Sequence, residues 1–195
     1  MDSRQGQRAP FILVGLCFGF RRLLGLVLPA GAFGRWGREV PDSKETCMTM
    51  AAILRGGALC GVMDITAAFV VYGFFGAKPF RILQGIASGL LGSKAFDGGL
   101  PSALLGLCLH FFIAFGAACV YVLLARWVNF LVQYVYFSGP LYGVAVYFFM
   151  QMIVVPLSGA RKGPFSFKMM LIGIVIHIFC VGLPISLVTR RYVRT

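Results

Sequence analysis

The sequence predicts an all-α integral membrane protein, a four-span helical bundle with a short amphipathic helix between spans one and two. Apolar residues make up 59% of the 195 residues and charged residues only 12%, whereas soluble domains hold about 45–50% and about 25%. Four stretches are also long and apolar enough to cross about 30 Å of hydrocarbon. They are too long and continuous for barrel strands, and only helices or closed barrels satisfy their backbone in lipid.

Each expected span is apolar apart from one strongly polar residue. The first carries Asp64, the second His110, the third Gln151 and the fourth His177. Prolines late in the third and fourth runs are expected to kink or end those helices, because proline lacks the N–H that a helix interior uses. The expected spans are residues 56–77, 98–125, 139–160 and 169–189.

The longer connections have their own character. Residues 80–91 predict a short amphipathic helix, with large apolar residues on one side and a stripe of glycine and serine that permits close packing. Residues 126–138 are rich in Trp, Phe and Tyr, which suits the headgroup layer of a membrane. We therefore favour an aromatic belt at this connection over a ligand groove.

The N-terminal stretch, residues 1–47, does not fit the scheme. Residues 11–33 are long enough to span, but a pair of arginines lies in the middle, and each costs about 2.5–3.5 kcal/mol on insertion scales. Our preferred hypothesis is that translation begins at Met48 or Met50, which makes this stretch a mis-assigned extension. An interfacial segment is the alternative. The transmembrane domain is then residues 48–195.

Composition also bears on partners and chemistry. The net charge is +12, but the basic residues flank the apolar runs, so we expect anionic lipid headgroups and no nucleic acid as partners. The six cysteines include no Cys-x-x-Cys pair, so neither a disulfide framework nor a metal site is expected. With only six acidic residues and no enzyme motif, we predict no catalytic residue, no cofactor and no enzymatic activity.

The four polar residues suggest a candidate site. At a rise of about 1.5 Å per residue, Asp64, His110, Gln151 and His177 are all expected near the middle of the bilayer, where they would form one hydrogen-bonded cluster. Such residues are functional candidates for handling protons or ions, and the alternative is that they only fix helix register. A second alternative is bis-His haem ligation by the two histidines.

Small residues at four-residue spacing are expected to let the spans approach closely. Pairs of glycine or alanine at this spacing allow the backbones of two membrane helices to come near each other. The candidate packing pairs are Gly57 with Gly61, Ala114 with Ala118, and Gly139 with Gly143.

Part of the chain resembles a known family. His110-Phe-Phe-Ile-Ala-Phe, the turn from Gly139 to Gly143, and Met152-Ile-Val-Val-Pro-Leu-Ser-Gly are similar to motifs of the YagU-like bacterial inner-membrane proteins. The resemblance covers residues 107–159. It implies a multi-pass protein of the bacterial inner membrane in a family without an assigned activity.

The sequence thus leaves several functions open. The leading prediction is a small proton or ion transport protein or a membrane-stress accessory protein, and the alternatives are a structural or assembly protein without transport and a bis-His haem redox protein. Expected partners are lipids and further copies of the chain or other membrane proteins. Arg35, Arg38 and Lys44 tip an almost even distribution of basic residues toward a topology with both termini in the cytoplasm.

Overall fold

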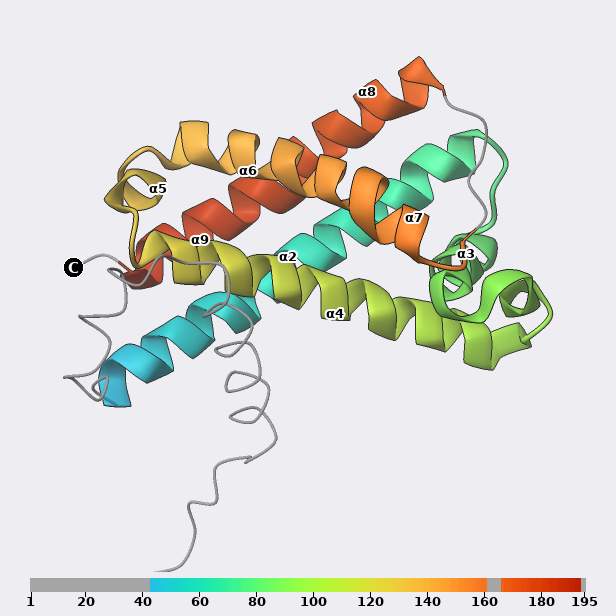
Figure 1. Ribbon diagram of the computed structural model, residues 1–195, viewed down its shortest axis with the longest axis horizontal. Helices are drawn as coiled ribbons and strands as arrows, with labels where there is room; N and C mark the ends of the chain where they lie inside the picture. The colour runs from blue at the N-terminus through green and yellow to red at the C-terminus, as the bar shows by residue number, and fades with distance from the viewer. Residues whose placement is uncertain (1–42, 161–165, 194–195) are drawn as a thin grey trace, which may run out of the picture. The chain divides into compact units, whose positions relative to one another are not determined.

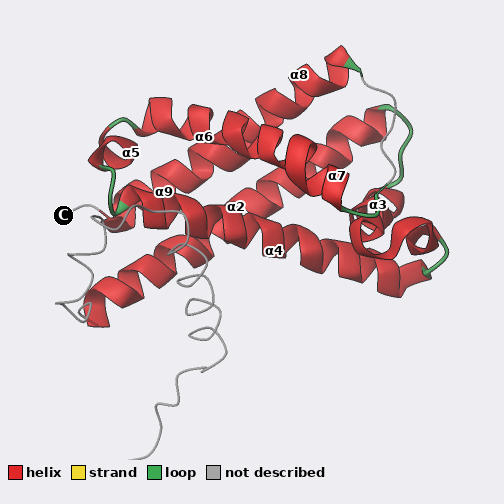
Figure 2. Ribbon diagram, viewed as in Figure 1, coloured by secondary structure: helices red, strands yellow, loops and turns green. Residues whose placement is uncertain are grey.

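The computed structural model describes residues 43–160 and 166–193, which belong to one compact unit formed by residues 42–195. Every regular element in these ranges is a helix (Figure 2). Four helices are long and apolar enough to cross a membrane, so the predicted all-α, four-span fold is confirmed. Most of the N-terminal stretch 1–47, including its arginine pair, lies outside the described residues. The four spans are Ser43–Phe74, Gly99–Ala125, Val135–Leu157 and Phe167–Val193.

The first span is the continuous helix α2 (Ser43–Phe74), which begins well before the expected start at residue 56 (Figure 1). Its 32 residues measure about 48 Å, longer than about 30 Å of hydrocarbon. The extra turns are held outside the apolar stretch, because Arg126 donates from Nη2 to Glu45 Oε1 at 2.9 Å and from Nη1 to Thr49 Oγ1 at 3.0 Å. Residues 43–47 therefore belong to the helical fold.

The predicted amphipathic helix forms as α3 (Pro79–Leu91) and continues into the 3₁₀ helix η2 (Gly92–Phe96). Its small and polar side packs on the protein, and its large apolar residues, including Leu90 and Leu91, are exposed. At Gly106 of α4 a side chain would collide with the backbone of α3. Of the glycine and serine stripe on α3, Ser88 is buried against the protein, whereas a Cβ at Gly85 would meet nothing within 4 Å. The stripe thus packs only in part.

The second span is α4 (Gly99–Ala125), which packs along α2. It is followed by the short helix α5 (Asn129–Gln133). The aromatic residues of this connection are exposed, including Trp127 at 56% and Tyr136 at 74%. Exposed rings at the end of a span fit the expected aromatic belt.

The third and fourth spans are each interrupted by a π-helical segment. The third consists of α6 (Val135–Phe149), η3 (Met150–Val154) and α7 (Val155–Leu157). The fourth consists of α8 (Phe167–Ile176), η4 (His177–Gly182) and α9 (Leu183–Val193). A proline follows each segment closely, and the wider π turn accommodates its missing N–H and the clash with the preceding turn. The fourth span continues past its proline to Val193.

The four spans pack as a bundle with a small-residue core. The first span contacts the second and fourth, and the third packs on η4 and α9. Arg55 lies over the ring of Tyr192, with 5.3 Å from Cζ to the ring centroid, so the beginning of the first span and the end of the fourth lie at the same end of the bundle. The core cluster consists of Cys60, Ala114, Ala118, Tyr121, Ala125, Val181 and Ile185.

Candidate functional site

Asp64 lies half-buried on α2 and turns toward the fourth span. Its carboxylate is close enough to the thiols of Cys60, on the same helix, and Cys180, in η4, to interact with them electrostatically. Across the described ranges 43–160 and 166–193, neither a hydrogen bond nor an ion pair joins Asp64 to His110 or His177. The expected pairing of this carboxylate with an imidazole is thus not formed in the structure.

His110 links the first two spans. Its Nε2 lies 2.9 Å from the carbonyl oxygen of Gly61, and since a carbonyl oxygen only accepts, Nε2 must carry the proton and donate. Its ring also meets Phe111 edge to face, with the ring centroids 5.6 Å apart. The bond joins α4 to the backbone of α2, which is the register-fixing role considered as an alternative from the sequence.

His177 and Gln151 are both placed near Tyr147. His177 opens η4, donates from Nδ1 to the Gly173 carbonyl oxygen at 2.8 Å and meets Tyr147 edge to face at 5.3 Å between ring centroids. Gln151 is exposed in η3, and its side chain lies within interaction range of the Tyr147 hydroxyl. The π-helical segments therefore carry two of the four predicted residues, with a buried tyrosine between them.

The haem alternative gains no support from this arrangement. The contacts of His110 are with Gly61 and Phe111, and those of His177 are with Gly173 and Tyr147, so the two imidazoles are not directed to a shared position. In the described part of the chain, no group of three or more His, Cys, Asp or Glu residues is arranged to hold a metal ion.

The predicted packing residues of the first two spans lie where α2 meets α4. A Cβ at Gly61 would come within 2.7 Å of Phe111 Cε1, and one at Gly57 would collide with Phe115. Ala114 and Ala118 are 8% and 0% exposed. The glycines on α2 thus receive the phenylalanine rings of α4, while the two alanines fill the core beside them.

The third and fourth spans touch through their backbones. A Cβ at Gly143 would lie 2.8 Å from the carbonyl carbon of His177 and 2.9 Å from Cα of Ile178. A Cβ at Gly182 would lie 2.7 Å from the Gly143 nitrogen, and one at Gly139 would lie 3.1 Å from the Gly182 oxygen. The sequence pointed to two of these three glycines, and the partner on the fourth span was missed.

A cluster of hydroxyl groups was also missed. The buried Tyr121 hydroxyl donates to the Leu131 carbonyl oxygen at 3.0 Å and lies 2.9 Å from Ser138 Oγ. Ser186 Oγ donates to the carbonyl oxygen of Val135 at 3.3 Å. Together these groups join spans two, three and four. Tyrosine in the interior of an apolar span is the signal that points to such a cluster, since its hydroxyl needs a partner when buried.

Comparisons with protein-family models, with curated proteins and with solved structures found no match to this chain. The resemblance to YagU-like proteins therefore stays a prediction.

Proposed function

We propose that this chain is a small multi-pass membrane protein that passes protons or another small ion along the interface of its first, third and fourth spans. The observation that carries the proposal is the position of four ionisable side chains around η4: Asp64 on α2, Tyr147 on α6, and His177 and Cys180 on η4 itself. Ionisable residues inside membrane spans are costly and commonly mark proton or ion pathways. π-Helical segments are also frequent at functional sites.

The bonding of His177 suits a relay. Because its Nδ1 donates to the Gly173 carbonyl oxygen, Nε2 of the neutral imidazole is an acceptor that takes up a proton. The neighbouring hydroxyl of Tyr147 both donates and accepts, and the carboxylate of Asp64, near Cys180 of η4, provides a second place for a proton. In this proposal the third and fourth spans hold the relay together through their glycine contact.

The test is proton flux into liposomes that hold the purified full-length chain and an entrapped pH-sensitive dye. Asp64→Asn removes the carboxylate with little change in volume and is expected to abolish flux. Asp97→Asn is the matched control, because Asp97 is an exposed residue between η2 and α4, outside the spans, and its variant should conduct like the parent protein. Equal flux through the parent and Asp64→Asn would refute the proposal.

A structural or assembly protein without transport is the second candidate. It is favoured by the bond from His110 to the Gly61 carbonyl oxygen and by the hydroxyl cluster, since these polar groups join spans to one another. Liposomes with the parent protein that show no more flux than empty liposomes would select this candidate.

We also propose the bacterial inner membrane as the location, with both termini in the cytoplasm and with lipids and other membrane proteins as partners. The motif resemblance supports the membrane assigned. The contact of Arg55 with Tyr192 and the ion pair of Arg126 with Glu45 support a common side for both chain ends, because they place these basic residues at one end of the bundle. A basic end favours the cytoplasmic face.

A further inference from the structure

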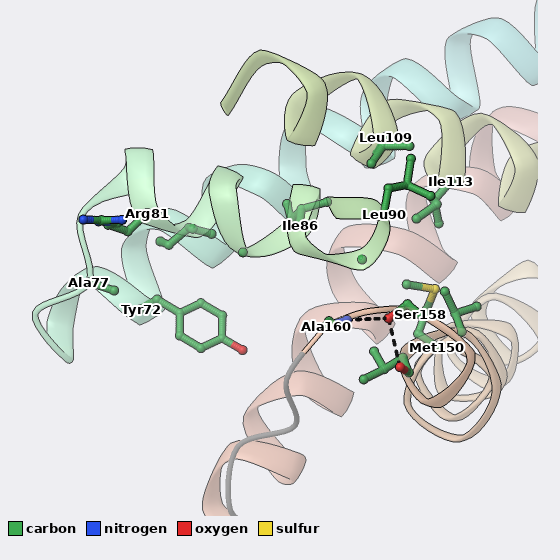
Figure 3. A pocket seen from close by; sticks show the side chains of 15 residues that line it. Tyr72, Ala77, Arg81, Ile86, Leu90, Leu109, Ile113, Met150, Ser158 and Ala160 are labelled. Atoms are coloured by element: carbon green, nitrogen blue, oxygen red, sulfur yellow. Dashed lines mark hydrogen bonds between the residues drawn. The ribbon is translucent and has the colours of Figure 1, made fainter. Parts of the chain in front are cut away.

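An apolar cavity of about 560 Å³ lies beneath the amphipathic helix α3 (Figure 3). It is bounded by α3, by the end of α2, by the first half of α4 and by η3 with the loop after α7. Its volume falls in the range of about 300–1,000 Å³ found for pockets that bury small molecules. Its walls include Ile86, Leu90, Leu109, Ile113, Met150 and Val154.

Glycine keeps this space open. Gly85 lines the cavity, and a Cβ at this position would meet nothing within 4 Å. Gly89 lines it too, with only the side chain of Ser158 nearby. Ser158 turns its hydroxyl to the Val155 carbonyl oxygen and receives the Ala160 N–H. The walls therefore offer mainly hydrocarbon to an occupant, with Tyr72 as a further lining residue (Figure 3). The polar groups of Ser158 and Ala160 satisfy one another.

A cation stands at one end of the cavity. Figure 3 shows Arg81 at the opposite end of α3 from Leu90 and Ser158. The Nη1 group of Arg81 donates to the Phe96 carbonyl oxygen at 3.0 Å and to Gln84 Oε1 at 3.2 Å. The guanidinium carbon lies 5.9 Å from the ring centroid of Phe96. No carboxylate pairs with Arg81 among the residues that the structure describes, so its positive charge is not neutralised and can attract an anion.

The position of the cavity and the charge of Arg81 indicate which kind of molecule binds there. The cavity lies at the end of a bundle whose outer surface contacts lipid, so an apolar space there is reached by acyl chains sooner than by polar solutes. An exposed guanidinium binds phosphate through two parallel hydrogen bonds. We propose that the cavity beneath α3 binds one anionic phospholipid, with an acyl chain between α3 and η3 and its phosphate on Arg81. This site is separate from the proposed relay around η4.

The experiment is native mass spectrometry of the delipidated, full-length protein titrated with phosphatidylglycerol or phosphatidylcholine. The parent protein is expected to retain one lipid tightly and to prefer phosphatidylglycerol. Arg81→Gln should weaken phosphatidylglycerol binding roughly tenfold, the order expected for a lost charge-assisted hydrogen bond, and Lys94→Gln should not. Lys94 is the control because it is an exposed cation of η2 that does not line the cavity.

A second pair of variants tests the apolar part. Gly85→Leu places a branched side chain in the cavity under α3, where an acyl chain would lie, and should abolish tight binding of both lipids. Gly116→Leu is its control, because a Cβ at Gly116 in α4 also meets nothing within 4 Å and the residue is not part of the lining. Equal melting temperatures of the two variants would show that both fold. Undiminished lipid binding by folded Gly85→Leu, or by Arg81→Gln, would overturn the proposal. A parent protein that forms a dimer, which Gly85→Leu dissociates, would also overturn it, because a second copy of the chain would then occupy the cavity.

Discussion

Replacing Gly143 by alanine tests whether the third and fourth spans touch through their backbones. The new Cβ would lie 2.8 Å from the carbonyl carbon of His177 and 2.9 Å from Cα of Ile178. Backbone atoms cannot rotate away as a side chain can, so α6 and η4 would have to separate by at least roughly 0.7 Å to reach the optimum of about 3.5 Å. Overpacking of this kind typically costs about 1–3 kcal/mol of folding free energy.

Gly116→Ala provides the matched control. Gly116 also lies inside a membrane helix, but a Cβ there meets nothing within 4 Å, so the substitution should stabilise by about 0.5–1 kcal/mol through helix propensity alone. The two variants should therefore differ by about 1.5–4 kcal/mol in the free energy of unfolding. Unfolding by sodium dodecyl sulfate in mixed micelles, followed by circular dichroism, measures this difference. Equal stability of the two alanine variants would refute the close backbone contact.

Further outcomes can be checked with similar effort. His110→Phe keeps the ring and removes the bond to the first span, and it should cost about 0.6 kcal/mol, with about 1.7 as the upper end for membrane hydrogen bonds; a gain in stability would contradict that bond. Tyr121→Phe should cost about 0.5–1.5 kcal/mol in the same assay, since it removes the hydrogen bonds of the tyrosine hydroxyl while Ser138 Oγ still donates to the Leu131 carbonyl oxygen. Reporter fusions after Lys162 and Thr195 should report opposite sides of the membrane, and the same side would remove the fourth span. Purified protein should show no stoichiometric Soret band, whose presence would support the haem alternative.

The four spans could be predicted because a helix that crosses the hydrocarbon core of a membrane needs a long apolar stretch, which is visible in the sequence. The beginning of the first span could not be placed this way. Lys44, Glu45 and Arg55 lower the hydropathy of its early turns. Nevertheless α2 begins at Ser43, because Glu45 is paired with Arg126, the residue that follows the end of α4. Hydropathy indicates where the apolar stretch of a span begins. Whether the helix extends beyond that stretch depends on contacts with residues distant in the sequence.

The candidate site was predicted less well, for a related reason. Depth along each span follows from counting residues, but rotation about the helix axis does not, and rotation decides which side chains meet. Counting placed His110 near Asp64 in depth, whereas in the structure its Nε2 turns to the carbonyl oxygen of Gly61. The π-helical segment at His177 changes the rotation of everything after it, and no local pattern announces it. Pro156 and Pro184 indicated only roughly where the third and fourth helices are interrupted, and not that a π-helical segment forms there.

The distribution of residue sizes has a consequence for how this chain can diverge. Many of its glycines, alanines and serines lie between helices, while many of its largest apolar side chains point outward, such as Phe112, Leu141 and Leu157, exposed by 66%, 58% and 83%. An outward leucine can become valine, isoleucine or phenylalanine without loss, because fluid lipid adapts to any shape. Gly106, Gly143 and Gly182 have no such freedom. Descendants of one ancestor should therefore keep their smallest residues and exchange their largest, the reverse of the pattern by which water-soluble proteins reveal their kinship.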